Sequence, residues 1–191
     1  CLIPVLVTGG IHLDGYADTC DALASCAPPE KKQEILKDPR CGAFAVIRLC
    51  AYFVAHLALC AALRPDGRAL WAMGLGFVLE RGLSGLAIAR FPLAKNTGLA
   101  HTFATAADRT AAGRILMAVC ALTAAAMIAL GGAAGGLMAL AALLVFWRYR
   151  VTADKQFGGL SGDLAGWFLQ RAELWMLGAL VLCQLVEARF L

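Results

Sequence analysis

The longest apolar stretch of the chain runs from Ile115 to Trp147 and reads ILMAVCALTAAAMIALGGAAGGLMALAALLVFW. A bilayer core about 30 Å thick needs roughly 20 apolar residues in a helix, so this stretch is too long for one membrane span. The run Gly131–Gly136 interrupts it near the middle. We predict two helices joined by a very short turn at these glycines. The alternative is one tilted helix that the glycines make flexible.

Three other windows meet the same length rule, namely Gly42–Leu63, Ala69–Ala89 and Leu164–Val186. Hydrophobic residues make up 61% of the chain, whereas ordinary soluble domains contain roughly 45–50%. The predicted fold class is therefore all-α, a polytopic integral membrane helix bundle with about five complete spans plus a partial first helix.

The first residues, Cys1–Val7, form an apolar run that is too short to span a bilayer or to act as a signal peptide. We expect the chain to start inside a membrane helix, with a preceding membrane segment absent. No linker or repeat divides the remainder, so residues 1–191 are expected to form a single membrane-embedded catalytic domain.

The basic residues are distributed unevenly between the connections. Eleven lie in the three longer connections, and three lie in the others. Because basic loops stay on the cytoplasmic side, the longer connections are predicted to be cytoplasmic in a bacterial inner membrane. The net charge of +4 is not concentrated in one block, which argues against nucleic-acid binding. The eleven are Lys31, Lys32, Lys37, Arg40, Arg90, Lys95, Arg109, Arg114, Arg148, Arg150 and Lys155.

A carboxylate-rich motif follows the first apolar residues. Residues 8–21 read TGGIHLDGYADTCD, with Asp14, Asp18 and Asp21 at i, i+4 and i+7. On a helix this spacing puts all three on one face. A divalent cation would relieve their repulsion, and Mg²⁺ commonly links carboxylates to phosphates. The motif thus predicts phosphoryl chemistry at a membrane surface, although each Asp alone could equally cap a helix or be solvated.

Charged and polar groups also occur inside the predicted spans. They need a partner or a polar cavity there, and structural ion pairs between helices are the alternative to substrate binding. The residues are Arg48, His56, Glu80, Arg81, Arg171 and Glu173. The eight cysteines include no Cys-x-x-Cys pair, so zinc binding is not expected. The cysteines are instead expected to be buried, reduced thiols.

Three motifs together carry a resemblance to a known family. They are Thr8–Asp21, the segment EILKDPRCG at Glu34–Gly42, and GGLSGD at Gly158–Asp163, with Glu80–Gly82 and Gly98–Asp108 in the expected order between them. The chain resembles cobalamin synthase, the adenosylcobinamide-GDP ribazoletransferase family, over nearly its whole length. Members of that family usually carry a further membrane stretch before the Thr-Gly-Gly element.

The resemblance implies transfer of the adenosylcobinamide phosphoryl group from adenosylcobinamide-GDP to α-ribazole or its 5'-phosphate, with release of GMP and Mg²⁺ as cofactor. The site would face the cytoplasm. We expect Asp14 to be the indispensable metal ligand, and Asp18 and Asp21 to share metal binding and the role of catalytic base. The partners are the two substrates and the lipid bilayer, and a homo-oligomer is left open.

Further residues are assigned to the same site, each with an alternative. Asp163 is predicted to bind metal or else to cap the last span, and Lys37 and Arg40 to contact phosphate or else to be ordinary membrane-surface charge. The remaining predicted substrate contacts are His12, which could instead pack between helices, Arg81 near the nucleotide or corrin phosphates, and the glycine pair Gly158 and Gly159.

Two other functions compete with this interpretation. A transporter could bind a cation with the carboxylate stripe, but these carboxylates lie at a predicted span edge and no inverted repeat is visible. A CDP-alcohol phosphotransferase would have an Arg where Asp18 follows Asp14-Gly15-Tyr16-Ala17. The sequence does not indicate which lower base is accepted or whether the acceptor is phosphorylated.

Overall fold

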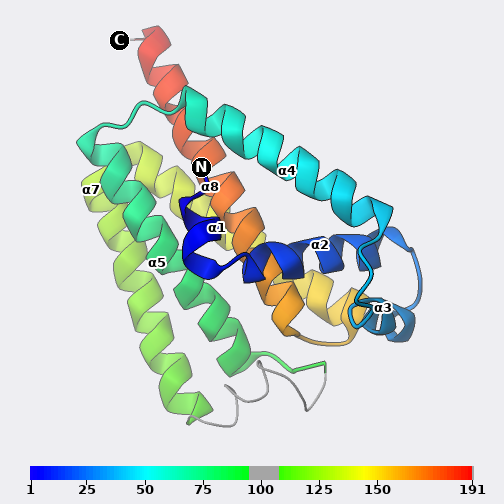
Figure 1. The fold of residues 1–191 in the computed structure, drawn as a ribbon. Coiled ribbons are helices and arrows are strands. Elements are labelled where there is room, and N and C mark those ends of the chain that lie inside the picture. The colour runs from blue at the N-terminus through cyan, green and yellow to red at the C-terminus, as the bar shows by residue number, and fades with distance from the viewer. Residues whose placement is uncertain (95–107, 191) are drawn as a thin grey trace.

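The computed structural model describes residues 1–94 and 108–190, and it is helical throughout most of both ranges (Figure 1). In the described residues the only β-type pairing is an isolated bridge between Leu93 and Leu160. The elements are α1 (Ile3–Thr8), α2 (Ile11–Ala24), α3 (Pro29–Ile35), α4 (Ala43–Ala62), α5 (Gly67–Arg90), α7 (Arg109–Thr152), the π-helical turn η1 (Ala153–Phe157) and α8 (Gly162–Phe190).

Helices α4, α5, α7 and α8 are long and apolar enough to cross a membrane, α7 together with η1. Their bounds match the predicted spans to within a few residues. Large apolar side chains point away from the bundle, for example Val54 and Leu122, which are 70% and 72% exposed. An apolar exterior of this kind suits hydrocarbon, and it confirms the predicted all-α membrane helix bundle.

Helix α7 reverses direction at Gly132, whose φ of 59° and ψ of −139° are not helical. A side chain at Gly135 would overlap with the carbonyl oxygen of Met127, because the two arms touch there. In Figure 1 the green and yellow arms meet near the label α7. The predicted pair of helices joined at the glycines is therefore confirmed, and with two spans in α7 the described residues contain five spans.

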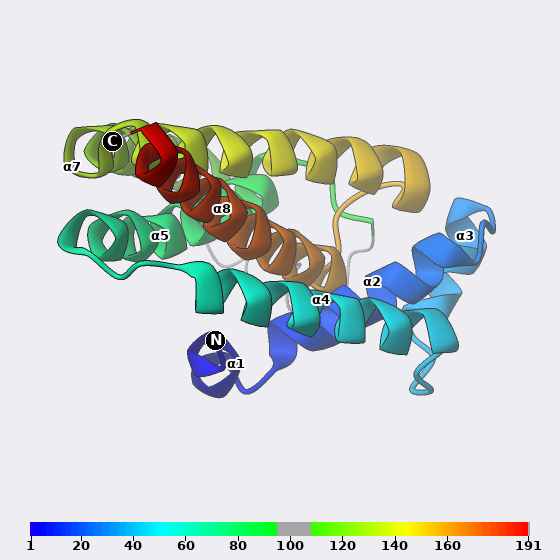
Figure 2. The same ribbon diagram turned by 90° about the horizontal axis from the view of Figure 1, so that it is seen from above.

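Helix α8 lies in the middle of the bundle and packs against α2, α4, α5 and α7 (Figure 2). Phe168 and Leu164 on α8 are fully buried, together with Tyr149 at the end of α7 and Phe157 in η1. The Tyr149 and Phe168 rings stack with centroids 4.9 Å apart. This aromatic core holds the end of α7 against the beginning of α8.

Helix α2 crosses the first turns of α8 at very close range. A Cβ atom on Gly15 would lie 2.8 Å from the Cα atom of Asp163, and one on Gly166 would lie 2.8 Å from the carbonyl oxygen of His12. Small residues allow two helix backbones to approach in this way. The crossing places the carboxylate motif of α2 beside the start of α8.

Candidate active site

The carboxylates of the first motif lie on a helix, as their spacing predicts. Helix α2 begins after Gly9 and Gly10, whose φ values of 62° and 82° turn the chain sharply away from α1. Asp14, Asp18 and Asp21 then follow one another along α2. The two glycines are needed here because side chains rarely adopt such positive φ angles.

Asp18 is the centre of a group of four carboxylates. Burial raises the pKa of Asp18 to about 6, and the negative charges of Asp14, Asp163 and Asp21 add to the shift. Asp163 belongs to the first turn of α8, so residues about 140 positions apart in sequence contribute to one electrostatic site. Repulsion among the four favours either a proton or a cation between them.

Ser161 lies at the N-cap position of α8, and Asp163 lies in the first turn of that helix. The Oγ atom of Ser161 accepts a hydrogen bond from the backbone N–H of Leu164 at 3.2 Å, which is the arrangement of an N-cap residue. Ser161 therefore caps α8, and the metal-binding role of Asp163 stays a prediction. The carboxylate remains part of the cluster around Asp18.

A pocket of about 690 Å³ opens beside the first two aspartates. Asp14 and Asp18 line it together with Lys37, and Leu49 and Phe53 of α4 supply apolar wall. A cavity that combines a polar cluster with an apolar wall is typical of a small-molecule site. The structure thus brings the predicted residues Asp14, Asp18 and Lys37 to one cavity.

Asp21 is turned toward another neighbour. Its carboxylate fills the space that a side chain on Gly42 would occupy, at the beginning of α4. Asp21 does not line the pocket, but its charge acts on Asp18. The beginning of a helix attracts negative charge, because its first N–H groups have no partner within the helix.

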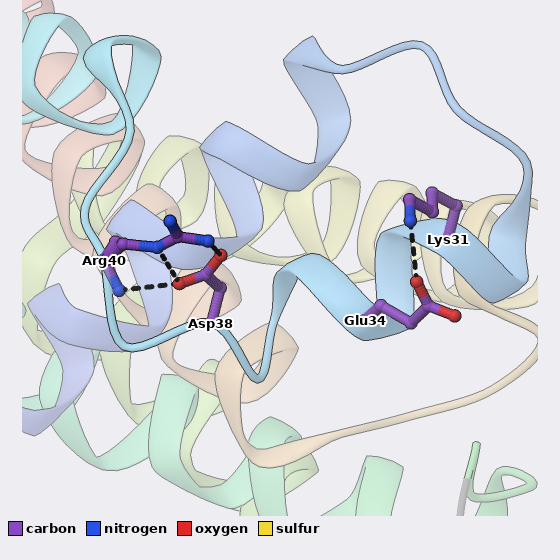
Figure 3. Close-up of polar contacts among 4 residues, drawn as sticks. All are labelled: Lys31, Glu34, Asp38 and Arg40. Carbon is purple, nitrogen blue, oxygen red and sulfur yellow. Dashed lines mark hydrogen bonds and ion pairs between the residues drawn. The ribbon is translucent and has the colours of Figure 1, made fainter.

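Lys37 and Arg40 differ in their surroundings, although both belong to the predicted phosphate contacts. The guanidinium of Arg40 donates to Asp38 through Nε at 2.9 Å and Nη2 at 2.7 Å, as Figure 3 shows. These hydrogen bonds lower the pKa of Asp38 to about 2. Lys31 is likewise paired with Glu34 at 2.9 Å (Figure 3). Lys37 is the basic side chain of this segment that lines the pocket.

His12 and Arg81 lie outside the pocket lining. Burial and the nearby charge of Arg81 lower the pKa of His12. Arg81 forms ion pairs with the buried carboxylates of Glu80 and, at 3.7 Å, Glu173. Glu80 is thus paired with the next residue of α5, and Glu173 with a residue of another helix, and only the second is the structural ion pair between helices that was the alternative.

Gly158 and Gly159 form a tight turn between η1 and α8, with φ values of 69° and 148°. A Cβ atom on Gly159 would lie 2.6 Å from the backbone nitrogen of Ala94. That nitrogen donates to the carbonyl oxygen of Leu160 at 2.8 Å. These glycines permit close packing against the segment after α5, and a phosphate contact stays a prediction.

Sequence reasoning did not identify the apolar wall of the pocket. Leu49 and Phe53 are four residues apart on α4 and so lie on one face of that helix. Apolar residues that face lipid or the core of a bundle have the same spacing, so the spacing does not indicate a pocket wall. Part of the Gly98–Asp108 motif falls on residues 95–107, outside the described residues.

The four carboxylates offer oxygen donors of the type that Mg²⁺ prefers. Hard oxygen ligands select magnesium, calcium or manganese over zinc. Within residues 1–94 and 108–190 no Lys or Arg is paired with Asp14, Asp18 or Asp21. Among the described residues, the group whose ligand atoms lie within 4.8 Å of one another is a different and softer one: Cys1, His56 and Cys60. Spacing could not show this group, because α4 and the first residue meet only in the folded chain.

Comparison with known proteins identifies the family. Residues 1–181 match the family model described as cobalamin-5-phosphate synthase. A relative from Lachnoclostridium phytofermentans is 42% identical over 90% of this chain and 65% of its own length. Relatives from Pseudomonas syringae pv. syringae and Listeria welshimeri are each 32% identical over 93% of this chain, and 72% and 70% of their own lengths.

These relatives carry the name adenosylcobinamide-GDP ribazoletransferase. The chain spans about two thirds of their length, 65% for the first. No solved structure matches the chain. The match along residues 1–181 includes all the motifs from which the resemblance was drawn, and the chain belongs to the cobalamin-5-phosphate synthase family.

Proposed function

We propose that this chain joins the two halves of a cobalamin by phosphoryl transfer. The adenosylcobinamide phosphoryl group moves from adenosylcobinamide-GDP to a hydroxyl of α-ribazole or α-ribazole 5'-phosphate, and GMP leaves. The observation that carries the proposal is the cluster of Asp14, Asp18 and Asp163, of which Asp14 and Asp18 line a large pocket, in a chain of this family.

Asp18 is suited to the role of base. The acceptor hydroxyl must lose its proton as its oxygen bonds to phosphorus and the bond to the GMP oxygen breaks. A pKa of about 6 keeps Asp18 ionised at neutral pH, yet basic enough to accept that proton. Asp18 lines the pocket, whereas Asp21 does not, which favours Asp18 over Asp21 for this step.

We assign Mg²⁺ binding to Asp14 and Asp163, with support from Asp18 and Asp21. The fit rests on the donor chemistry, since the four carboxylates are all hard oxygen ligands and the charges of the other three raise the pKa of Asp18. When bound, Mg²⁺ neutralises charge on the transferred phosphoryl group and on the leaving phosphate. Lys37 supplies a further positive charge in the pocket for the phosphates of the substrate.

The site is assigned to the cytoplasmic face of a bacterial inner membrane. Helix α2 leads into the basic segment 25–42, Asp163 directly follows the basic segment 148–162, and basic connections stay in the cytoplasm. This position also argues against a transporter, whose cation site is expected near the bilayer midplane.

The test is turnover by the purified membrane protein with adenosylcobinamide-GDP, α-ribazole 5'-phosphate and Mg²⁺, with GMP and corrinoid product measured together. Product should depend on Mg²⁺ and disappear in Asp14→Asn. Asp154→Asn is the matched control, because Asp154 is exposed and ion-paired with Arg150 at 3.8 Å. Full turnover and unchanged Mg²⁺ dependence in Asp14→Asn would disprove the assigned metal role.

A further inference from the structure

A second pocket lies on the other side of α2. Its volume is about 320 Å³, and three arginines from three helices line it: Arg48 of α4, Arg148 of α7 and Arg171 of α8. Tyr16 and Cys20 of α2 complete one wall. These two positions follow Asp14 and Asp18 by two residues each, which is about 200° around a helix. The carboxylates and this arginine pocket therefore occupy opposite faces of α2.

The three guanidinium groups have no anionic partner in the part of the chain that the structure describes. None of the described lining residues is acidic, and the ion pairs of the described residues involve other basic side chains. The Nε atom of Arg171 is buried without a hydrogen bond, and its guanidinium lies over the ring of Trp167, 4.9 Å from the centroid.

A fourth basic group lies next to the same pocket. The buried Lys32 donates from Nζ to the Oε1 atom of Gln156, and Gln156 lines the pocket. Positive groups this close repel each other, and burial near a membrane increases the repulsion. An anion that accepts hydrogen bonds from several guanidinium groups would remove this penalty, and phosphate has the matching geometry.

An apolar groove adjoins the arginine pocket. Its volume is about 260 Å³, and Arg148 and Arg171 line both cavities. Ala141, Leu144 and Val145 of α7 and Trp175 of α8 form the rest of the groove. Leu144 and Trp175 are 57% and 55% exposed, on the outer surface of the spans. A hydrophobic groove therefore begins where the cationic pocket ends.

We propose that the arginine pocket and this groove together bind one anionic phospholipid. Its phosphate contacts Arg48, Arg148 and Arg171, and an acyl chain lies in the groove between α7 and α8. Basic pockets between membrane helices bind anionic headgroups in this manner. A soluble phosphate compound would match the arginines equally well, but it would leave the adjoining apolar groove without an occupant. The lipid would hold α4, α7 and α8 together around α2.

The test is native mass spectrometry of the purified protein with phosphatidylglycerol or phosphatidylcholine added in equal amounts. The wild-type protein should retain more phosphatidylglycerol than phosphatidylcholine. Arg148→Gln should reduce this preference about fivefold, as expected for one basic contact to an anionic headgroup. Arg114→Gln is the matched control, since Arg114 is an exposed arginine on the other arm of α7 and outside the pocket.

A second variant separates a lipid from a soluble phosphate. Ala141→Trp fills the groove without changing charge, so it should reduce phosphatidylglycerol retention and leave the binding of inorganic phosphate unchanged. Equal retention of the two lipids by the wild-type protein would overturn the proposal. So would phosphatidylglycerol retention that Ala141→Trp does not alter, or that millimolar inorganic phosphate abolishes. Circular dichroism and gel filtration establish that each variant is folded, and Arg48→Gln replaces Arg148→Gln if the latter is not.

Discussion

Two groups of acidic side chains in this molecule have opposite surroundings. Glu80 and Glu173 are buried between α5 and α8, and Arg81 is ion-paired with both. Asp14 and Asp18 lie beside an open pocket, and in the described residues no basic side chain is paired with either. The first group has a counter-charge from the chain itself, with one arginine shared by two carboxylates, whereas the second has negative charge available for a ligand. A carboxylate in a membrane protein therefore indicates function when its counter-charge is missing.

The largest expected effect is the loss of activity in Asp14→Asn. Removing a metal-binding carboxylate should lower kcat/KM by about 10³-fold, since a bound metal supplies several kcal/mol of transition-state stabilisation. The thermal unfolding midpoint should stay within a few degrees of wild type or rise, because one repulsive charge is removed. If Asp14→Asn is active and its activity still depends on Mg²⁺, Asp14 has a structural role and does not bind the metal.

Arg81→Leu should have the opposite effect on the paired glutamates: it should lower stability and leave activity nearly unchanged. This change leaves two buried glutamates without their counter-charge, and breaking a buried pair destabilises by about 3–5 kcal/mol. The lower end is expected, because the Arg81 side chain is 39% exposed. Unfolding in detergent measures the loss, and turnover per folded molecule should change little. A large fall in kcat at unchanged stability would instead support the substrate contact predicted for Arg81.

Gly15→Ala tests whether the close helix crossing assembles the carboxylate group. The added methyl carbon would lie 2.8 Å from the Cα atom of Asp163, so α2 and α8 must move apart. Such overpacking costs about 1–3 kcal/mol, and we expect about a tenfold loss of turnover at saturating substrate together with weaker Mg²⁺ dependence. Gly162→Ala is the control, because nothing lies within 4 Å of its Cβ position.

The smallest expected effect is a pH dependence of Mg²⁺ binding. In the metal-free protein the pKa of Asp18 is raised from 3.8 to about 6, so the folded state holds this proton more tightly than the unfolded state. This group therefore favours folding most below about pH 4, and its contribution falls as the pH rises toward about 6. Mg²⁺ should raise the unfolding midpoint more at pH 7.5 than at pH 5, since protons compete for the same carboxylate.

Asp18→Asn is the matched variant for that measurement. It should reduce the difference between the two pH values, because the titrating group is gone. A Mg²⁺ response that is equal at both pH values in the wild-type protein would show that Asp18 does not take part in metal binding.

The spans and the glycine turn of α7 could be predicted from the sequence, since apolar length and glycine runs are local properties. The shared helix face of Asp14, Asp18 and Asp21 could be predicted for the same reason, because it follows from spacing within one helix. The pairing of Glu80 and Glu173 with Arg81 could not be predicted, because Glu173 comes from another helix. Nor could sequence show that Ser161 caps α8, or that Leu49 and Phe53 form a pocket wall.

The sequence by itself determined that this is a helical membrane protein with a carboxylate motif of the cobalamin-5-phosphate synthase type. Hydrophobic length and helical periodicity act within one segment, and a bilayer allows few structures other than helices. Only the tertiary structure decided that Asp163 joins Asp18, and that three arginines face one pocket on the opposite side of α2. Those outcomes depend on how closely separate helices approach, and that is set by packing between residues far apart in the chain.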